Sequence, residues 1–368
     1  MPTLDDLDTP CLVLDRAKVA ANAARLKARL AALGVPLRLH VKTAKCTEAV
    51  ALVLGGEKAP ITVSTLKEAE QFFEAGYRDF LYAVGFERHK LARAQALAQR
   101  GAKLTLLVDS VEAVQGITGF PVLIEIDTDG HRAGVKPDDE AQLVAIAKAL
   151  EKAGCTAAGV LTHAGGSYNS VNLAEIEAIA EQERAGAVAA AQALRRAGFA
   201  APVVSVGSTP TAHFARKLDG VTEVRAGVFV FFDLVMAGIG VCRTEDLALS
   251  VLATVIGHRA DRGWILVDAG WMALSRDRGT ARQRVDQGYG VVCDQDGRAI
   301  PGLIVTETNQ EHGVVAMRDG SPPPALPVGT RLRILPNHAC ATGAQHERYH
   351  VVEGAREVKA DWPRFSGW

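Results

Sequence analysis

The chain has 368 residues, which is enough for one large domain and a smaller one. It is 48% hydrophobic and 23% charged with a formal net charge of −1, so it has no overall basic field that would indicate a nucleic-acid partner. The first fifteen residues contain no basic run, and the most apolar stretch, 226–242, is interrupted by Asp233. We therefore expect no secretory signal, no membrane span and a cytoplasmic location.

The six cysteines are scattered along the chain and form no CxxC pair. In a chain of this length without an export signal, they are expected to be reduced thiols rather than a disulfide framework. Five of them are interpreted as small core residues, and the sixth, Cys340, is considered separately below.

The first two thirds of the chain alternate short β-branched runs with longer amphipathic segments. A strand at 9–15 and a helix at 16–33 come first. Eight further strands are predicted at 37–43, 59–65, 79–85, 103–110, 122–129, 157–165, 202–209 and 221–230. The longest predicted helix covers 172–198, between the sixth and seventh of these strands. Eight β-then-α units favour an α/β fold with a parallel (β/α)8 TIM-type barrel. An open Rossmann sheet is disfavoured because no GxGxxG follows the first strand.

The pattern changes after about residue 245, where strand-like runs are separated by turns such as DRG and DQDGR. No helix is predicted among them, so the C-terminal region is expected to be an all-β domain. The strand at 9–15 has no barrel partner and is assigned to this domain as well. The predicted division is a barrel at 16–240 and a β domain formed by 1–15 plus 241–368.

Polar residues gather where the predicted barrel strands end, which is where barrel active sites lie. They are His40 and Lys42 at the end of the first strand, Arg132 after the fifth, His163 at the end of the sixth with Tyr168 just after it, Gly207, Ser208 and Thr209 at the end of the seventh, and Arg225 and Gly227 on the eighth. This clustering indicates an enzyme.

Lys42 is expected to point into the barrel mouth on the same face as His40. A desolvated lysine there could act as an imine-forming nucleophile, whereas the alternative is a solvated lysine near a strand end. Gly207, Ser208 and Thr209 offer amides and hydroxyls for a phosphate, and Gly227 would let the backbone approach the same group. The alternative for this segment is an ordinary polar turn.

His338 and Cys340 lie two residues apart at the end of a predicted strand, so both side chains can face one way. An imidazole and a thiolate suit zinc or another borderline divalent metal, and two protein ligands would leave positions for water and substrate. Chance and core packing explain many such pairs.

Several segments resemble one family over almost the whole chain and in the same order. LRLHVKTAKC resembles the cofactor-lysine segment of fold-type-III pyridoxal-phosphate enzymes, which are alanine-racemase-like barrels with a β domain. PNHACATG, IEIDTDGHRAGV, LTHAGGSY and VVSVGSTPTA resemble the D-threo-3-hydroxyaspartate dehydratase and D-serine dehydratase-like family within the D-threonine aldolase superfamily. The sequence is identified as a member of that family.

The resemblance implies roles for individual residues. Lys42 would hold pyridoxal 5'-phosphate as an imine, Arg132 would contact its phenolic oxygen, and His163 would lie against its ring. The phosphate would be held by Gly207, Ser208, Thr209, Gly227 and Val228. Either Tyr168 or Arg225 would meet the pyridine nitrogen, and Tyr168 matches the dehydratase pattern. His338 and Cys340 would bind one divalent metal, either zinc or manganese, cobalt or nickel.

The implied reaction is metal-assisted β-elimination from a small β-hydroxy-D-amino acid, with D-threo-3-hydroxyaspartate giving oxaloacetate and ammonia, or D-serine giving pyruvate. A D-threonine-type aldolase, an amino-acid racemase and a non-catalytic cofactor carrier are the alternatives. The aldolase branch has aspartate at the position of Cys340, and carriers lack the β domain. The family also implies a homodimer that uses an amino-acid substrate and neither nucleic acid nor membrane.

Arg276 and Arg278 follow the predicted strand that ends in DAG. Either could form a two-pronged pair with the second carboxylate of hydroxyaspartate. The alternative is that both lie in a solvated loop or a subunit contact.

Overall fold

The computed structural model describes residues 2–368, and contacts between residues divide it into two compact units. The barrel unit consists of Ala24–Lys42, Leu54–Gly227 and Gly367–Trp368, and the sheet unit consists of the residues up to Ala23, Thr43–Val53 and Val228–Ser366. The predicted domain division at 15/16 and 240/241 remains a proposal. Met1, the first residue of the predicted β domain, lies outside the described residues.

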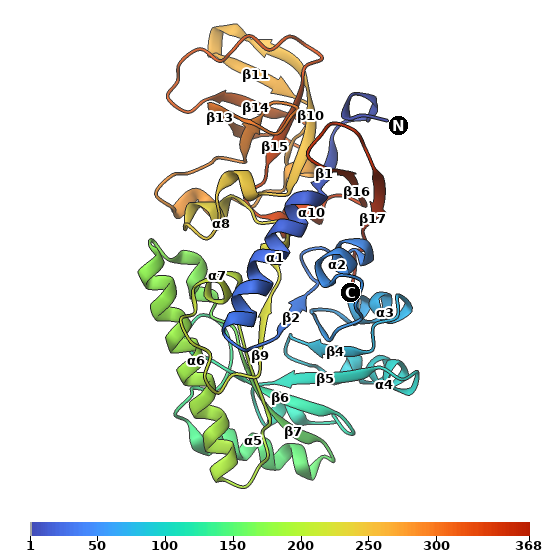
Figure 1. Ribbon diagram of the computed structural model, residues 1–368, viewed down its shortest axis with the longest axis vertical. Coiled ribbons are helices and arrows are strands. Elements are labelled where there is room, and N and C mark those ends of the chain that lie inside the picture. Colours follow the sequence, from blue (N-terminus) through green and yellow to red (C-terminus); the bar gives the residue numbers. More distant parts are fainter. Residues whose placement is uncertain (1) are drawn as a thin grey trace. The chain divides into compact units, whose positions relative to one another are not determined.

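The barrel unit contains a closed barrel of eight parallel strands in chain order (Figure 1). These are β2 (Leu37–His40), β3 (Ile61–Val63), β4 (Asp79–Tyr82), β5 (Lys103–Val108), β6 (Pro121–Ile126), β7 (Thr156–Thr162), β8 (Val203–Val206) and β9 (Glu223–Ala226). β9 pairs in parallel with β2, which closes the ring. The predicted TIM-type barrel is therefore confirmed, with each strand shorter than its predicted range.

Helices follow most of the barrel strands: α2 (Thr47–Leu54), α3 (Leu66–Glu74), α4 (Leu91–Gln99), α5 (Glu140–Lys152), α6 (Leu173–Arg196) and α7 (Thr209–Phe214). α6 begins at the side chain of Asn172, which accepts the Glu175 amide, and it buries an alanine-rich face. In the connection between β5 and β6, all of which the structure describes, the only helical element is the 3₁₀ turn Glu112–Val114. α1 (Arg16–Ala32) contributes residues to both units.

The interior of the barrel combines an apolar layer with a polar chain. Leu81, Leu107, Leu123 and Leu161 belong to one buried cluster. Arg38 on β2 forms an ion pair with Glu223 on β9 at 3.1 Å, and Glu223 accepts a hydrogen bond from Ser205 on β8. These bonds satisfy charged groups that would otherwise be costly to bury.

The sheet unit contains one nine-stranded sheet with the order β11-β14-β13-β12-β15-β10-β1-β16-β17. Its strands are β1 (Cys11–Asp15), β10 (Leu249–Arg259), β11 (Trp264–Val267), β12 (Val291–Cys293), β13 (Ala299–Thr308), β14 (Gly313–Met317), β15 (Arg331–Leu335), β16 (Arg348–Val352) and β17 (Ala360–Pro363). β10 pairs with both β11 and β15, so the six strands from β11 to β10 in this sheet order form a closed ring. β1 lies between β10 and β16, as Figure 1 shows.

The expectation that no helix follows residue 245 is wrong in two places. α9 (Trp271–Leu274) and α10 (Ala339–Gly343) are single helical turns between strands. Segments of four or five residues are too short to display a helical period in the sequence. His338 is the residue that precedes α10, so the predicted metal segment is a strand-to-helix turn. α8 (Leu234–Gly238) also belongs to this unit.

Among residues 2–368, no helix combines the length and apolarity that crossing a bilayer requires.

Candidate active site

Lys42 lies two residues after the end of β2, and its backbone nitrogen is 3.5 Å from Nδ1 of His40. The side chain of Lys42 is exposed. The expectation of a desolvated lysine is therefore not met. An exposed amine can nevertheless act as the nucleophile that attacks a carbonyl group. Burial, followed by the charges of Lys42, Arg225 and His163, lowers the pKa of His40 well below its usual range. His40 is thus a neutral imidazole at physiological pH.

His163 follows β7, and its Nδ1 lies 3.0 Å from the carbonyl oxygen of Gly207. Since a carbonyl can only accept, Nδ1 carries the proton. Burial, and next the charge of Lys42, lower the pKa of His163 to about 3. His163 is therefore a neutral ring, which suits packing against an aromatic cofactor.

The segment Gly207–Thr209 connects β8 to α7, and a buried carboxylate lies behind it. Glu183 of α6 is 2% exposed, and its Oε1 accepts the backbone N–H groups of Ala164 and Gly207, both at 2.9 Å. The Ser208 N–H donates to the hydroxyl of Thr211 at 3.0 Å. The expectation of free amides is therefore not met at Gly207 and Ser208. Glu183 instead ties together the two loops that follow β7 and β8.

Gly207 has a positive φ of 135°, and a Cβ at this position would lie 2.2 Å from the carbonyl oxygen of Arg225. Only glycine permits this close approach of two barrel strands. The hydroxyl of Ser208 lies 2.9 Å from that of Ser167, so this loop also contacts the turn that carries Tyr168.

Arg225 of β9 is 4% exposed and donates to the hydroxyl of Ser205 at 2.9 Å and to the carbonyl of Thr162 at 2.6 Å. Its Nε is buried and has no hydrogen-bond partner among residues 2–368. A buried donor without a partner is costly, so this atom favours a bound polar group. Tyr168, the other candidate for the pyridine nitrogen, has its hydroxyl 3.5 Å from the backbone nitrogen of Thr209.

Three further predicted cofactor residues have distinct positions. Arg132 is exposed and pairs with Glu125 of β6 at 3.2 Å, and its charge contributes to the lowered pKa of His163. Gly227 ends the second segment of the barrel unit, and the buried Val228 begins the third segment of the sheet unit. Arg132 therefore belongs to the barrel unit, whereas the chain passes from the barrel unit to the sheet unit between Gly227 and Val228.

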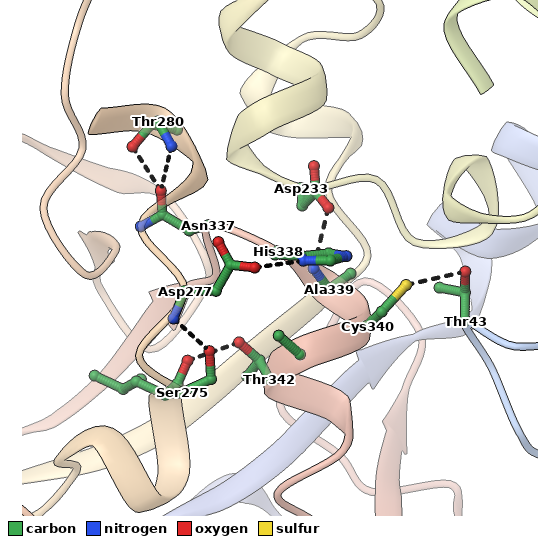
Figure 2. Close-up of polar contacts among 12 residues, drawn as sticks. Thr43, Asp233, Ser275, Asp277, Thr280, Asn337, His338, Ala339, Cys340 and Thr342 are labelled. Carbon is green, nitrogen blue, oxygen red and sulfur yellow. Dashed lines mark hydrogen bonds and ion pairs between the residues drawn. The ribbon is translucent and has the colours of Figure 1, made fainter. Parts of the chain in front are cut away.

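The sheet unit brings His338 and Cys340 together with carboxylates, as Figure 2 shows. Nδ1 of His338 lies 2.7 Å from Oδ2 of Asp277. Asp233 is 2% exposed, and its Oδ2 accepts the Ala339 N–H at 3.0 Å. The thiol of Cys340 donates to the hydroxyl of Thr43 at 3.3 Å.

The charges around His338 favour a cation. Burial opposes protonation of His338, but Asp277, Cys340 and Asp233 outweigh burial and raise its pKa to about 11. A metal ion can replace the proton in such an anionic setting. No group of three or more metal-binding side chains is present within residues 2–368. The imidazole of His338 and the thiol of Cys340 are of the kinds that zinc and other borderline divalent metals take as ligands.

Arg276 and Arg278 are both exposed and already have partners. The Arg276 guanidinium lies 4.6 Å from the centre of the Trp271 ring, and Arg278 pairs with Asp286 at 2.5 Å. Their predicted contact with a substrate carboxylate remains a prediction.

Sequence reasoning missed four residues that organise these sites: Glu183, Asp277, Asp233 and Thr43. Glu183 occupies one position of a long helix rich in glutamate, where nothing in the sequence distinguishes it. Asp277 lies between Arg276 and Arg278, the two residues that were predicted as substrate anchors. Thr43 directly follows Lys42, so its position next to the predicted cofactor lysine is the sequence feature that could have identified it.

Comparisons with known proteins identify the family of the chain. The alanine racemase N-terminal domain family matches residues 14–235, and the putative serine dehydratase domain family matches residues 248–352. The chain is 56% identical to D-threo-3-hydroxyaspartate dehydratase of Delftia sp. (strain HT23), over 100% of this chain and 99% of the relative. It is 31% identical to D-threonine aldolase of Arthrobacter sp, over 96% and 93%.

Solved structures show the same relationship. That of the Delftia sp. HT23 dehydratase covers 100% of both chains with a TM-score of 0.97 and 56% identity. A second structure, with the same TM-score, identity and coverage, is a cysteine-to-alanine variant of D-threo-3-hydroxyaspartate dehydratase in the metal-free form. The resemblance read from the sequence is confirmed, and the chain belongs to the D-threo-3-hydroxyaspartate dehydratase and D-serine dehydratase-like family of alanine-racemase-like pyridoxal-phosphate enzymes.

Proposed function

We propose that this protein eliminates the β-hydroxyl group of D-threo-3-hydroxyaspartate and yields oxaloacetate and ammonia. The observation that carries the proposal is the 56% identity to the dehydratase over the full length of the chain. The two clusters of polar residues agree with it, since one offers an amine among cationic groups and the other offers an imidazole and a thiol among carboxylates.

Pyridoxal phosphate supplies an electron sink for the carbanion that forms when the α-proton is removed. In our proposal Lys42 would hold the cofactor through its amine, and the same amine, when free, would take the α-proton. The neutral ring of His163 would pack against the cofactor ring. Ser208, Thr209, Gly227 and the backbone of Val228 would hold the phosphate, and Arg132 would hold the phenolic oxygen. The unpaired Nε of Arg225 makes this residue a candidate for the pyridine nitrogen beside Tyr168.

Hydroxide is a poor leaving group, so its departure needs a Lewis acid on the β-oxygen. His338 and Cys340 would hold a divalent metal for this step. Zinc is the metal that imidazole and thiolate ligands favour, and manganese, cobalt or nickel are the alternatives. Loss of water from the substrate leaves an enamine, and hydrolysis of its imine form consumes a water and releases ammonia.

The family suggests other substrates or outcomes. D-Serine would give pyruvate by the same route. The D-threonine aldolase relative favours retro-aldol cleavage to glycine, but the family resemblance places aspartate in aldolases at the position of Cys340. We also propose that the protein is a cytoplasmic homodimer, in keeping with its family.

Product analysis tests the proposed function. The holoenzyme is incubated with the 3-hydroxyaspartate isomers, D-serine and D-threonine, each with and without a chelator. We expect ammonia and oxaloacetate from D-threo-3-hydroxyaspartate, and loss of both products after chelation. Glycine would identify an aldolase instead, and an inverted substrate without ammonia would identify a racemase.

A further inference from the structure

The two segments that carry Asp277 and His338 are joined at three levels within the sheet unit (Figure 2). Thr342 donates to the carbonyl of Leu274 at 2.8 Å at one end. The hydroxyl of Thr280 donates to the Asn337 side chain at 2.5 Å at the other end. The contact between Asp277 and His338 lies between these two bonds in both segments. The surrounding structure therefore determines where Asp277 points.

Ser275 supplies a second sign that the position of Asp277 is constrained. Its φ of 72° and ψ of 166° lie in a region that is almost reserved for glycine. The conformation is held by the Ser275 N–H, which donates to the carbonyl of Trp271 at 2.9 Å. The hydroxyl of Ser275 in turn accepts the Asp277 N–H at 3.0 Å. A strained residue two positions before Asp277 thus directs its carboxylate toward His338.

The contact itself has a chemical consequence for the imidazole. An ionised carboxylate can only accept, so the Nδ1 of His338 that faces Asp277 must carry a proton. When the ring gives up its other proton, the lone pair is on Nε2, which is the atom that would face a metal. Without an acceptor at this place, both tautomers and both orientations of the ring become accessible.

We propose that Asp277 is a positioning residue that fixes the tautomer and the orientation of His338, so that Nε2 of this residue is presented to the metal. The inference rests on the metal site of the proposed function. Carboxylate partners of metal-bound histidines raise the basicity of the ligand, and their loss typically weakens metal binding about 10- to 100-fold.

Cobalt(II) is a suitable probe because a cobalt–thiolate bond absorbs light. Metal-depleted protein that retains pyridoxal phosphate is titrated with Co²⁺, and affinities are measured by competition with a chromophoric chelator. We expect Asp277→Ala to bind Co²⁺ about 10- to 100-fold more weakly than wild type. Asp277→Asn keeps an acceptor for Nδ1 and is expected to stay within roughly threefold of wild type. Asp277→Leu, which has the size of Asn but no acceptor, should resemble Asp277→Ala.

Matched controls separate a positioning role from a general one. Asp261→Asn removes an exposed carboxylate of the same unit that pairs with Arg259, and it should leave the affinity unchanged. Visible absorbance of the cofactor should be the same in all folded variants, which would show that the change is confined to the metal site. If Asp277→Ala does not fold, the comparison of Asp277→Leu with Asp277→Asn carries the test.

The outcomes distinguish the inference from the function on which it rests. If wild type and Cys340→Ala bind Co²⁺ equally, the metal site of the proposed function is wrong. If wild type binds and Cys340→Ala does not, but Asp277→Ala and Asp277→Leu bind as wild type does, the positioning role is wrong. Equal weakening in Asp277→Asn and Asp277→Ala would likewise overturn it, because the negative charge would then matter rather than the position of an acceptor. Nitrogen-15 histidine spectra of the zinc-loaded protein should show the Nδ1–H tautomer of His338 in wild type.

Discussion

His163 in the barrel unit and His338 in the sheet unit have the same side chain in opposite electrostatic settings. Burial and the positive charges of Lys42 and Arg225 lower the pKa of His163 to about 3. Around His338, Asp277, Cys340 and Asp233 outweigh burial and raise its pKa to about 11. The barrel cluster therefore suits anionic groups such as a phosphate, and the sheet cluster suits a cation. The difference shows that the surroundings of a histidine, rather than the residue type, decide its chemical role.

The largest expected effect is on the barrel side of this comparison. Lys42→Ala should abolish turnover, because the substitution removes both the anchor and the base. Borohydride reduction of wild-type holoenzyme, followed by digestion and mass spectrometry, should find the pyridoxyl group on Lys42. Its recovery on Lys45 would show that the wrong lysine has been assigned.

Loss of the thiol tests the sheet side. Cys340→Ala should lower dehydratase activity by more than about 100-fold, because the Lewis acid would lose one of its two protein ligands. Metal content and ammonia release are measured together, with Cys242→Ala as a control thiol of the same unit. Full activity in metal-free Cys340→Ala protein would exclude a metal role. Cys340→Asp, which recreates the ligand pair of the aldolase branch, should show weakened dehydration.

Arg276 and Arg278 test whether the sheet unit also contributes a cationic group for the substrate. If one of them pairs with the second carboxylate of hydroxyaspartate, its replacement by alanine should lower kcat/KM for that substrate roughly 30-fold or more, while D-serine loses much less. Equal losses on both substrates for both variants would rule out these arginines as the anchor.

Substitution of Glu183 tests whether its hydrogen bonds to the loops after β7 and β8 support cofactor binding. Glu183→Ala would leave the amides of Ala164 and Gly207 unsatisfied in a buried place, at a cost of about 1–3 kcal/mol each. We expect affinity for pyridoxal phosphate to fall roughly tenfold, measured by absorbance titration of cofactor-free protein. Glu183→Gln retains a carbonyl oxygen that can accept both bonds, so its affinity should remain near that of wild type. A loss as large in Glu183→Gln would indicate that the charge matters instead.

The smallest effect concerns His213 of α7, a buried residue of the barrel unit whose Nδ1 lies 2.8 Å from the Thr209 carbonyl. Burial lowers the pKa of His213 from 6.5 to about 4. The unfolded chain therefore binds a proton below pH 6.5 that the folded protein takes up only near pH 4, so stability falls as the pH falls through this window. At about pH 5 the loss is on the order of 2 kcal/mol.

Urea unfolding of wild type and His213→Gln at about pH 7.5 and pH 5 measures this contribution. The variant should lose less unfolding free energy between the two pH values, by on the order of 2 kcal/mol. His89→Gln, at an exposed histidine of the same unit, is the control. The same pH dependence in His213→Gln and wild type would show that His213 does not contribute.

The sequence by itself determined the order of the eight barrel strands, the candidate lysine and the imidazole–thiolate pair. These features are local, because strand periodicity and the spacing of His338 and Cys340 lie within a few residues. Tertiary structure decided which groups surround them. Asp277 meets His338 across 61 positions of sequence, and Glu183 meets Gly207 across 24. Residue patterns cannot show such contacts, since they depend on how segments far apart in the sequence are brought together. The contact with Asp277 contributes to the charge around His338, and the contacts of Glu183 join the loops on either side of His163.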